Sequence, residues 1–95
     1  MPLNCALRGE FLRHQIADSG ARLVVCEAHY AERLFAIEDG APSIAACVIR
    51  GVCDGPATRL SLHNLDAILG SDDPVAARPV GPGDLALVLY TSGTT

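Results

Sequence analysis

The stretch RLVVCE, residues 22–27, is a short apolar run with two β-branched valines and is typical of a β-strand. Two further runs have the same character, SIAACVIR at 43–50 and LALVLY at 85–90. None of them alternates strictly between apolar and polar residues, so both faces of each strand are expected to be buried, as in parallel sheets covered by helices. The sequence therefore predicts an α/β fold, with a layered, mostly parallel sheet and flanking helices.

The segments between these runs carry helix and loop signals. Apolar residues recur near helical spacing in 7–18, LRGEFLRHQIAD, and Gly20 is suited to the left-handed position after a helix. A second helix is predicted over 28–38, with an imperfect apolar stripe, and a short one over 62–69. Residues 70–84 hold three Pro, three Gly and three Asp, which indicates an exposed loop.

The composition fits one small globular domain and excludes several classes of partner. Hydrophobic residues are 49% of the 95 and charged residues 19%. The net charge is −4 and every basic residue is an Arg, spread singly, whereas a nucleic-acid binder normally has a clustered basic face. No targeting leader and no stretch near the ~18 residues of a spanning helix is visible, so no membrane span is predicted.

The cysteines indicate a reducing compartment. Cys5, Cys26, Cys47 and Cys53 lack the close-paired spacing of a metal knuckle or a redox motif. Most of them lie in or beside apolar runs, as buried free thiols do. A reduced, cytoplasmic protein is therefore expected.

The candidate binding site is TSGTT, residues 91–95, directly after the run 85–90. In open α/β sheets ligands gather at the carboxyl ends of the strands, where this loop is expected to lie. Gly93 lets the backbone curl around an anion, and hydroxyls add donors on both sides of it. The set suits the oxygens of a polyphosphate, although it is not a Walker pattern. Composition alone leaves open a plain polar, frayed tail.

The stretch GDLALVLYTSGTT, residues 83–95, resembles the phosphate-binding motif of the adenylate-forming superfamily, the acyl-CoA synthetases and other AMP-dependent synthetases and ligases. PLNCALRGEFLRHQIADSGARLVVCE, residues 2–27, is also similar to that superfamily's helix, DSGA turn and strand. The resemblance covers nearly the whole chain, with 50–80 the least distinctive part. It implies that residues 1–95 are a fragment of an AMP-binding N-terminal domain, ending inside the phosphate-binding loop and forming part of a larger fold.

The resemblance implies an ATP-dependent acid–thiol ligase, in which a carboxylate attacks the α-phosphate of ATP and the acyl group then passes to coenzyme A. ATP, Mg²⁺ and coenzyme A are implied for the parent enzyme, with a carboxylic acid substrate of the fatty-acid or carnitine type. The residues matching the motif would hold the outer phosphates of ATP; they are Thr91, Ser92, Gly93, Thr94 and Thr95.

This sequence departs from the superfamily's pattern in ways that bear on activity. The motif's Lys is absent, the chain contains no Lys at all, and the later motifs of the superfamily are missing. The chain alone is therefore expected to be inactive and to hold no cofactor tightly. Its exposed apolar edges favour self-association. The rival hypothesis is a small non-catalytic α/β module that binds a nucleotide or a protein.

Other candidate sites have ordinary explanations. Cys26 and His29 could offer two metal ligands, but no second pair of residues has suitable spacing. Cys26 is therefore expected to be an apolar residue packed in a strand, and His29 a surface residue. His14 and His63 have no evident nucleophilic partner in sequence.

Two acidic pairs, Glu38-Asp39 and Asp72-Asp73, could be magnesium ligands. Both adjoin Gly or Pro in apparent loops. They are therefore predicted to be solvated carboxylates rather than a metal site.

Overall fold

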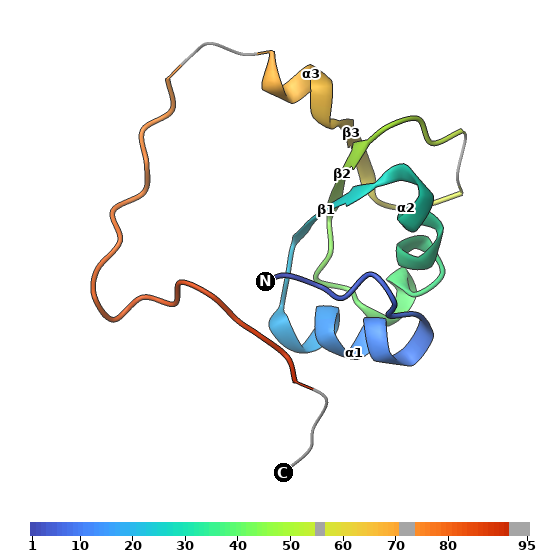
Figure 1. Cartoon of the computed structure of the whole chain (residues 1–95), viewed down its shortest axis with the longest axis horizontal. Helices are drawn as coiled ribbons and strands as arrows, with labels where there is room; N and C mark the ends of the chain where they lie inside the picture. The colour runs from blue at the N-terminus through green and yellow to red at the C-terminus, as the bar shows by residue number, and fades with distance from the viewer. Residues whose placement is uncertain (55–56, 71–73, 92–95) are drawn as a thin grey trace.

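The computed structural model describes residues 1–54, 57–70 and 74–91. Figure 1 shows a small sheet with helices packed against it, and a long segment, residues 74–91, that runs apart from the sheet and comes back toward the first helix. In chain order the elements are α1 (Gly9–Ser19), β1 (Leu23–Glu27), α2 (Ala28–Phe35), the 3-10 turn η1 (Glu38–Gly40), β2 (Ala46–Arg50), β3 (Ser61–Asn64) and α3 (Leu65–Leu69).

The sheet confirms the predicted α/β class. Its order is β1-β2-β3 and both pairings are parallel. The register places Leu23 beside Ala46 and Ala46 beside Ser61, so the three strands start level with one another. The carboxyl ends of all three strands consequently meet at one end of the sheet.

The core lies between the helices and one face of this sheet. Leu12 and Ile16 of α1 and Leu34 of α2 form one buried cluster with Cys47 and Ile49 of β2. The cluster explains the helical spacing of apolar residues in the first segment, since α1 turns that stripe toward β2.

Glycine ends α1 as predicted. Gly20 has φ 68°, in the left-handed region, and its N–H donates to the carbonyl of Ala17 at 3.2 Å. Ser19 adds a hydroxyl hydrogen bond to the carbonyl of Ile16 at 2.9 Å. The chain can therefore reverse sharply and enter β1 three residues later.

The predicted helix boundaries need two corrections. α2 ends at Phe35 rather than at residue 38, because Ile37 leaves the helical region (φ −114°, ψ 0°) and Glu38 begins η1. The predicted helix 62–69 begins only at Leu65, because Ser61–Asn64 pair with β2 as β3. Asn64 marks the boundary, since its side chain accepts a hydrogen bond from the N–H of Asp66 at 2.9 Å.

The predicted strand 85–90 is wrong for this structure. These residues adopt no strand and pair with no part of the sheet, while Leu85, Leu87 and Leu89 are 86%, 57% and 65% exposed. The third strand of the sheet is β3 instead. The prediction of an exposed loop before this segment is confirmed for 74–84, which contain no helix or strand.

The prediction that both faces of each strand are buried is also wrong at β1. Leu23 and Val25 point away from the core cluster and are 54% and 61% exposed. The physical reason is that α1 and α2 both pack on the opposite face. Among the described helices, none is both long and apolar enough to cross a membrane.

Candidate functional site

The structure places the start of the candidate loop against α1. The hydroxyl of Tyr90 donates to Oδ2 of Asp18 at 2.7 Å, and the Tyr90 ring meets the His14 ring edge-on with centroids 6.5 Å apart. This hydrogen bond raises the pKa of the Tyr90 phenol above its ordinary value. Thr91 follows and is exposed, whereas the predicted ligands Ser92, Gly93, Thr94 and Thr95 lie outside the described residues.

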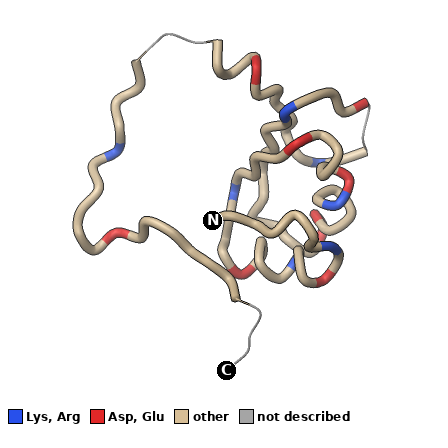
Figure 2. The backbone as a smooth tube through the Cα atoms, viewed as in Figure 1, with Lys and Arg blue, Asp and Glu red and all other residues tan. Residues whose placement is uncertain are grey.

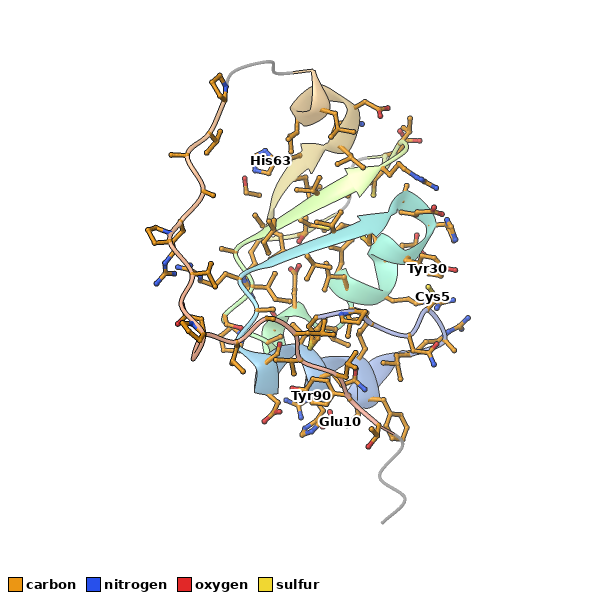
Figure 3. All side chains as sticks on the ribbon, turned by 60° about the vertical axis from the view of Figure 1, so that its left-hand side comes forward. Cys5, Glu10, Tyr30, His63 and Tyr90 are labelled. Carbon is orange, nitrogen blue, oxygen red and sulfur yellow. The ribbon has the colours of Figure 1, made fainter. Side chains whose placement is uncertain are left out.

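This location differs from the predicted one. Asp18 belongs to the last turn of α1, which leads directly into β1, so Tyr90 is held near the amino end of the sheet. Figure 3 shows Tyr90 and His63, on β3, at opposite ends of the domain. Residues 85–90 thus do not lead from the sheet into the loop, and the expected placement of the loop at the carboxyl ends of the strands concerns residues 92–95, which lie outside the described residues.

Among the described residues, the carboxyl end of the sheet holds paired charges. Arg50 donates to Oε1 of Glu27, and Nδ1 of His29 lies 3.5 Å from the other oxygen of the same carboxylate. Gly51 follows β2 with φ 105°, a conformation that favours glycine. The side chain of Asn64 donates to its carbonyl at 3.3 Å. The one Arg at this end, among the described residues, is thus already neutralised.

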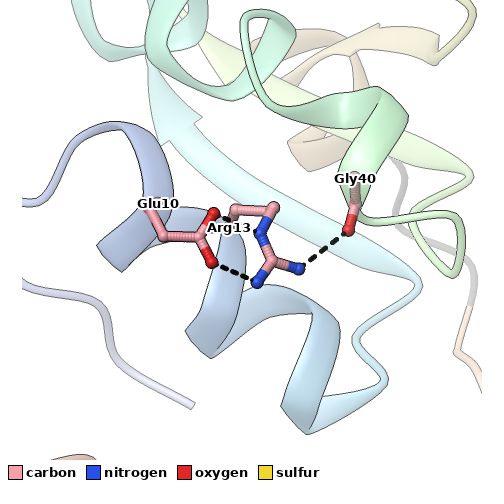
Figure 4. Close-up of polar contacts among 3 residues, drawn as sticks. All are labelled: Glu10, Arg13 and Gly40. Atoms are coloured by element: carbon pink, nitrogen blue, oxygen red, sulfur yellow. Dashed lines mark hydrogen bonds and ion pairs between the residues drawn. The ribbon is translucent and has the colours of Figure 1, made fainter.

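Charges elsewhere are dispersed, as expected from the sequence. Figure 2 shows blue and red positions interspersed along the described chain, with no basic face. Several form local pairs, of which the contact between Glu10 and Arg13 on α1 is the clearest. In Figure 4 the Arg13 guanidinium also reaches the carbonyl of Gly40, at 3.4 Å. The hydrogen bond from Arg13 lowers the pKa of Glu10, and the same contact raises the pKa of Arg13.

A buried polar cluster escaped the sequence analysis. Glu38 is only 8% exposed, and its carboxylate accepts hydrogen bonds from the Thr58 hydroxyl and from the backbone N–H of Arg59 at 3.1 Å. The Arg59 guanidinium in turn donates to the carbonyls of Glu38 at 2.8 Å, Ala41 at 3.1 Å and Ile44 at 2.5 Å. Through these hydrogen bonds the cluster, Glu38–Thr58–Arg59, connects the segment before β2 to the segment before β3.

The cluster corrects one prediction about the acidic pairs. Glu38 is not a solvated carboxylate, because two donors compensate for its burial. A signal was present in the sequence, since Glu38 occupies the position that would extend the apolar stripe of 28–38. Asp39 is exposed, as predicted, and Asp72-Asp73 lie outside the described residues.

All four cysteines are free thiols, as predicted, though their burial varies. Cys47 is wholly buried, Cys26 and Cys53 are half-buried and Cys5 is exposed. The Sγ atoms of Cys26 and Cys47 lie 3.7 Å apart. This contact lowers the pKa of the Cys26 thiol, and together with burial it raises the pKa of Cys47.

The histidines build no metal or nucleophilic site among the described residues. His29 contacts Glu27, and its ring lies tilted against that of Tyr30 with centroids 4.0 Å apart. No group of three His, Cys, Asp or Glu side chains in the described chain could hold a metal ion. His63 does have a hydroxyl neighbour, because Nε2 lies 3.1 Å from Oγ of Ser61. Their spacing of two on a strand could have revealed this contact. Both are exposed, so the pair lacks the desolvated surroundings that activate a nucleophile.

Comparison with known proteins identifies the family. The family model described as AMP-binding enzyme matches residues 1–95, the motif at 91–95 included. The chain belongs to this family. The resemblance to the adenylate-forming superfamily is thereby confirmed.

Three curated relatives of this chain are CoA ligases or synthases. A 3-hydroxybenzoate–CoA ligase from Aromatoleum sp. (strain CIB) is 31% identical over 93 residues, which cover 98% of this chain and 17% of the relative. Feruloyl-CoA synthases from Amycolatopsis sp. and Streptomyces sp. are each 33% identical over 95 residues, covering 100% of this chain and 16% of the relative. The chain thus spans about a sixth of these relatives, and no solved structure matches it significantly.

Proposed function

We propose that residues 1–95 serve an adenylate-forming acid–thiol ligase as the segment that leads into its ATP phosphate-binding loop. The observation that carries this proposal is the unbroken family match, which runs through the motif at 91–95. In the parent enzyme a carboxylic acid would be adenylated and then transferred to coenzyme A. This chain by itself would supply only part of that site.

The residues present fit a polyphosphate. Thr91, Ser92, Thr94 and Thr95 carry hydroxyl donors, and Gly93 lacks the Cβ that would obstruct the close approach of backbone N–H groups. ATP, when bound with Mg²⁺, would supply the phosphoryl electrophile that activates the acid. The chain's own part would be to hold and orient the outer phosphates, so that negative charge on the leaving pyrophosphate is stabilised.

For the acid we propose a hydroxylated aromatic carboxylate in place of the fatty acid expected from the sequence. The support is that the relatives' names specify 3-hydroxybenzoate and feruloyl groups. Coenzyme A would be the acceptor. The free thiols of this chain favour a reducing, cytoplasmic location.

A segment exchange tests the proposal. The 93 aligned residues of the Aromatoleum ligase are replaced by this chain, and acid-dependent exchange of pyrophosphate into ATP is measured with 3-hydroxybenzoate, ferulate and a fatty acid. We expect exchange with the aromatic acids, and a loss of about 10²-fold in the Gly93→Val chimera, the usual scale for losing oxyanion-type donors. Gly83→Val is the matched control, because a Cβ there meets nothing within 4 Å.

Two outcomes would contradict the proposal. One is a folded chimera without exchange, and the other is a Gly93→Val chimera as active as the Gly83→Val control. Micromolar binding of ATP by this chain alone would instead favour the small-module hypothesis.

A further inference from the structure

Cys26 on β1 and Cys47 on β2 form a pair of thiols within the sheet. The register places Cys47 level with Val24, and Cys26 follows two residues later on β1, so the side chains of both cysteines lie on the same face of the sheet. Their Sγ atoms are 3.7 Å apart. The two residues are 21 positions apart in the chain, so no local sequence motif signals the pair.

The two thiols differ in their access to solvent. Cys47 is wholly buried in the core cluster, whereas Cys26 is half-buried, so a reagent in solution reaches Cys26 first. The hydrogen bond between the two thiols also lowers the pKa of Cys26 and raises the pKa of Cys47. Because the thiolate is the nucleophilic form, Cys26 is suited to attack an oxidant and Cys47 to react with the product.

We propose that Cys26 and Cys47 form a reversible, peroxide-sensitive switch, in which oxidation links β1 to β2 through a disulfide. In a reducing compartment a disulfide is usually transient and redox-sensing rather than structural, which fits a pair that is otherwise present as free thiols. The inference concerns regulation and does not depend on ATP or on ligase activity.

The oxidant is a hydroperoxide, and the reaction has two steps. The Cys26 thiolate attacks one peroxide oxygen, so that an S–O bond forms and the O–O bond breaks; the hydroxide that leaves takes up the proton that Cys26 lost. The Cys47 thiol then attacks the sulfur of this sulfenic acid, an S–S bond forms, the S–O bond breaks, and a second water leaves with the Cys47 proton. The two thiols are oxidised and the peroxide is reduced to water.

The disulfide would act on the segment between the two cysteines. Residues 27–46 contain α2 and η1, and the new bond closes them into a loop. The Sγ atoms must approach from 3.7 Å to about 2.05 Å. A diagonal pair is farther apart in the backbone than a level pair, so the bond draws β1 and β2 together locally and stays easily reduced.

Peroxide oxidation of the reduced, folded chain tests the switch without any substitution. Hydrogen peroxide is added, the remaining thiols are alkylated, and the products are identified by intact mass and peptide mapping. We expect the chain to lose two hydrogen atoms and the Cys26–Cys47 link to be the main product, with Cys5 and Cys53 still alkylated. In chain unfolded by urea the links should spread over other pairs. A folded chain that is linked mainly through Cys5 or Cys53, or that forms no link, would overturn the proposal.

Variants separate the roles of the two thiols. Cys47→Ala should leave Cys26 as a sulfenic acid that dimedone labels, whereas Cys26→Ala should leave the buried Cys47 unlabelled. Cys53→Ala is the matched control, because Cys53 packs against the same core cluster and its loss should not change the yield of the link. Labelling of Cys47 in a folded Cys26→Ala chain would refute the assigned order of attack.

Hydrogen exchange measures the structural consequence. In the oxidised chain the backbone amides of α2 should exchange several-fold more slowly than in the reduced chain, because the closed loop restrains the helix. Dithiothreitol should restore the faster exchange. Equal exchange in the two forms, or a link that dithiothreitol does not reduce in the folded chain, would contradict a reversible switch.

Discussion

Replacing Arg59 by Met should destabilise the fold more than any other change of a basic residue. Methionine keeps much of the apolar stem but removes the donors to the carbonyls of Glu38, Ala41 and Ile44. With net values of about 1–1.5 kcal/mol for each hydrogen bond, the three together contribute about 3–4.5 kcal/mol. A small domain has only about 5–15 kcal/mol of total stability, so the loss is a large part of it.

Urea denaturation followed by far-UV circular dichroism measures this effect. With an m-value of about 1 kcal/mol/M for so short a chain, the midpoint should fall by about 3 M or the variant should be unfolded in water. The matched control is Arg78→Met, which makes the same chemical change at an exposed position. Its effect should stay within about 0.5 kcal/mol. If Arg59→Met changed stability no more than this control, the Glu38–Thr58–Arg59 cluster would not hold the fold together as argued.

Two further predictions concern single residues, and a third concerns the affinity of the chain for Mg-ATP. Gly20→Ala, at φ 68°, should cost about 1 kcal/mol and lower the melting temperature by about 4–8 °C, whereas Gly83→Ala should leave it unchanged. Asp18→Asn should lower the pKa of Tyr90 toward the usual value near 10, because the hydrogen bond to the Asp18 carboxylate raises that pKa. The stability that this contact gives is present below pH ~10. It is lost as the pH rises through the raised pKa of Tyr90. Ultraviolet titration would contradict this if the variant and the unmodified chain ionised alike. Calorimetry should find that the chain binds Mg-ATP with a Kd of about 1 mM or weaker, because the phosphate loop has no Lys; micromolar affinity would refute that.

The elements that the sequence predicted well are those whose pattern depends on near neighbours. The apolar spacing of α1 and the β-branched run of β1 depend on residues within one or two turns, and Gly20 ends the helix through its own backbone freedom. β2 was predicted for the same reason. In each of them the local preference and the tertiary environment agree.

The elements that were missed depend on distant partners. β3 has four exposed residues, and it is a strand only because β2 offers a pairing edge. Conversely, 85–90 has the composition of a strand but pairs with no strand among the described residues. The early end of α2 follows from Glu38, which contacts residues 20 and 21 positions away.

The candidate site could be predicted from the sequence only through the resemblance. A motif of small hydroxyl residues indicates a phosphate ligand by its chemistry, but its position depends on where 85–90 runs. The Tyr90–Asp18 contact joins residues 72 positions apart, and no local pattern signals it.

The cluster around Arg59 also determines where the chain can be cut or lengthened. The irregular chain at 41–45 has no helix or strand of its own, yet two of its carbonyls are held by one guanidinium. A protease must draw a segment of backbone into its cleft, so this loop should resist nicking although it lacks regular structure. Residues 74–84 are all exposed and have no such anchor, which makes them the place where proteolysis, inserted tags or a new pair of termini should be tolerated.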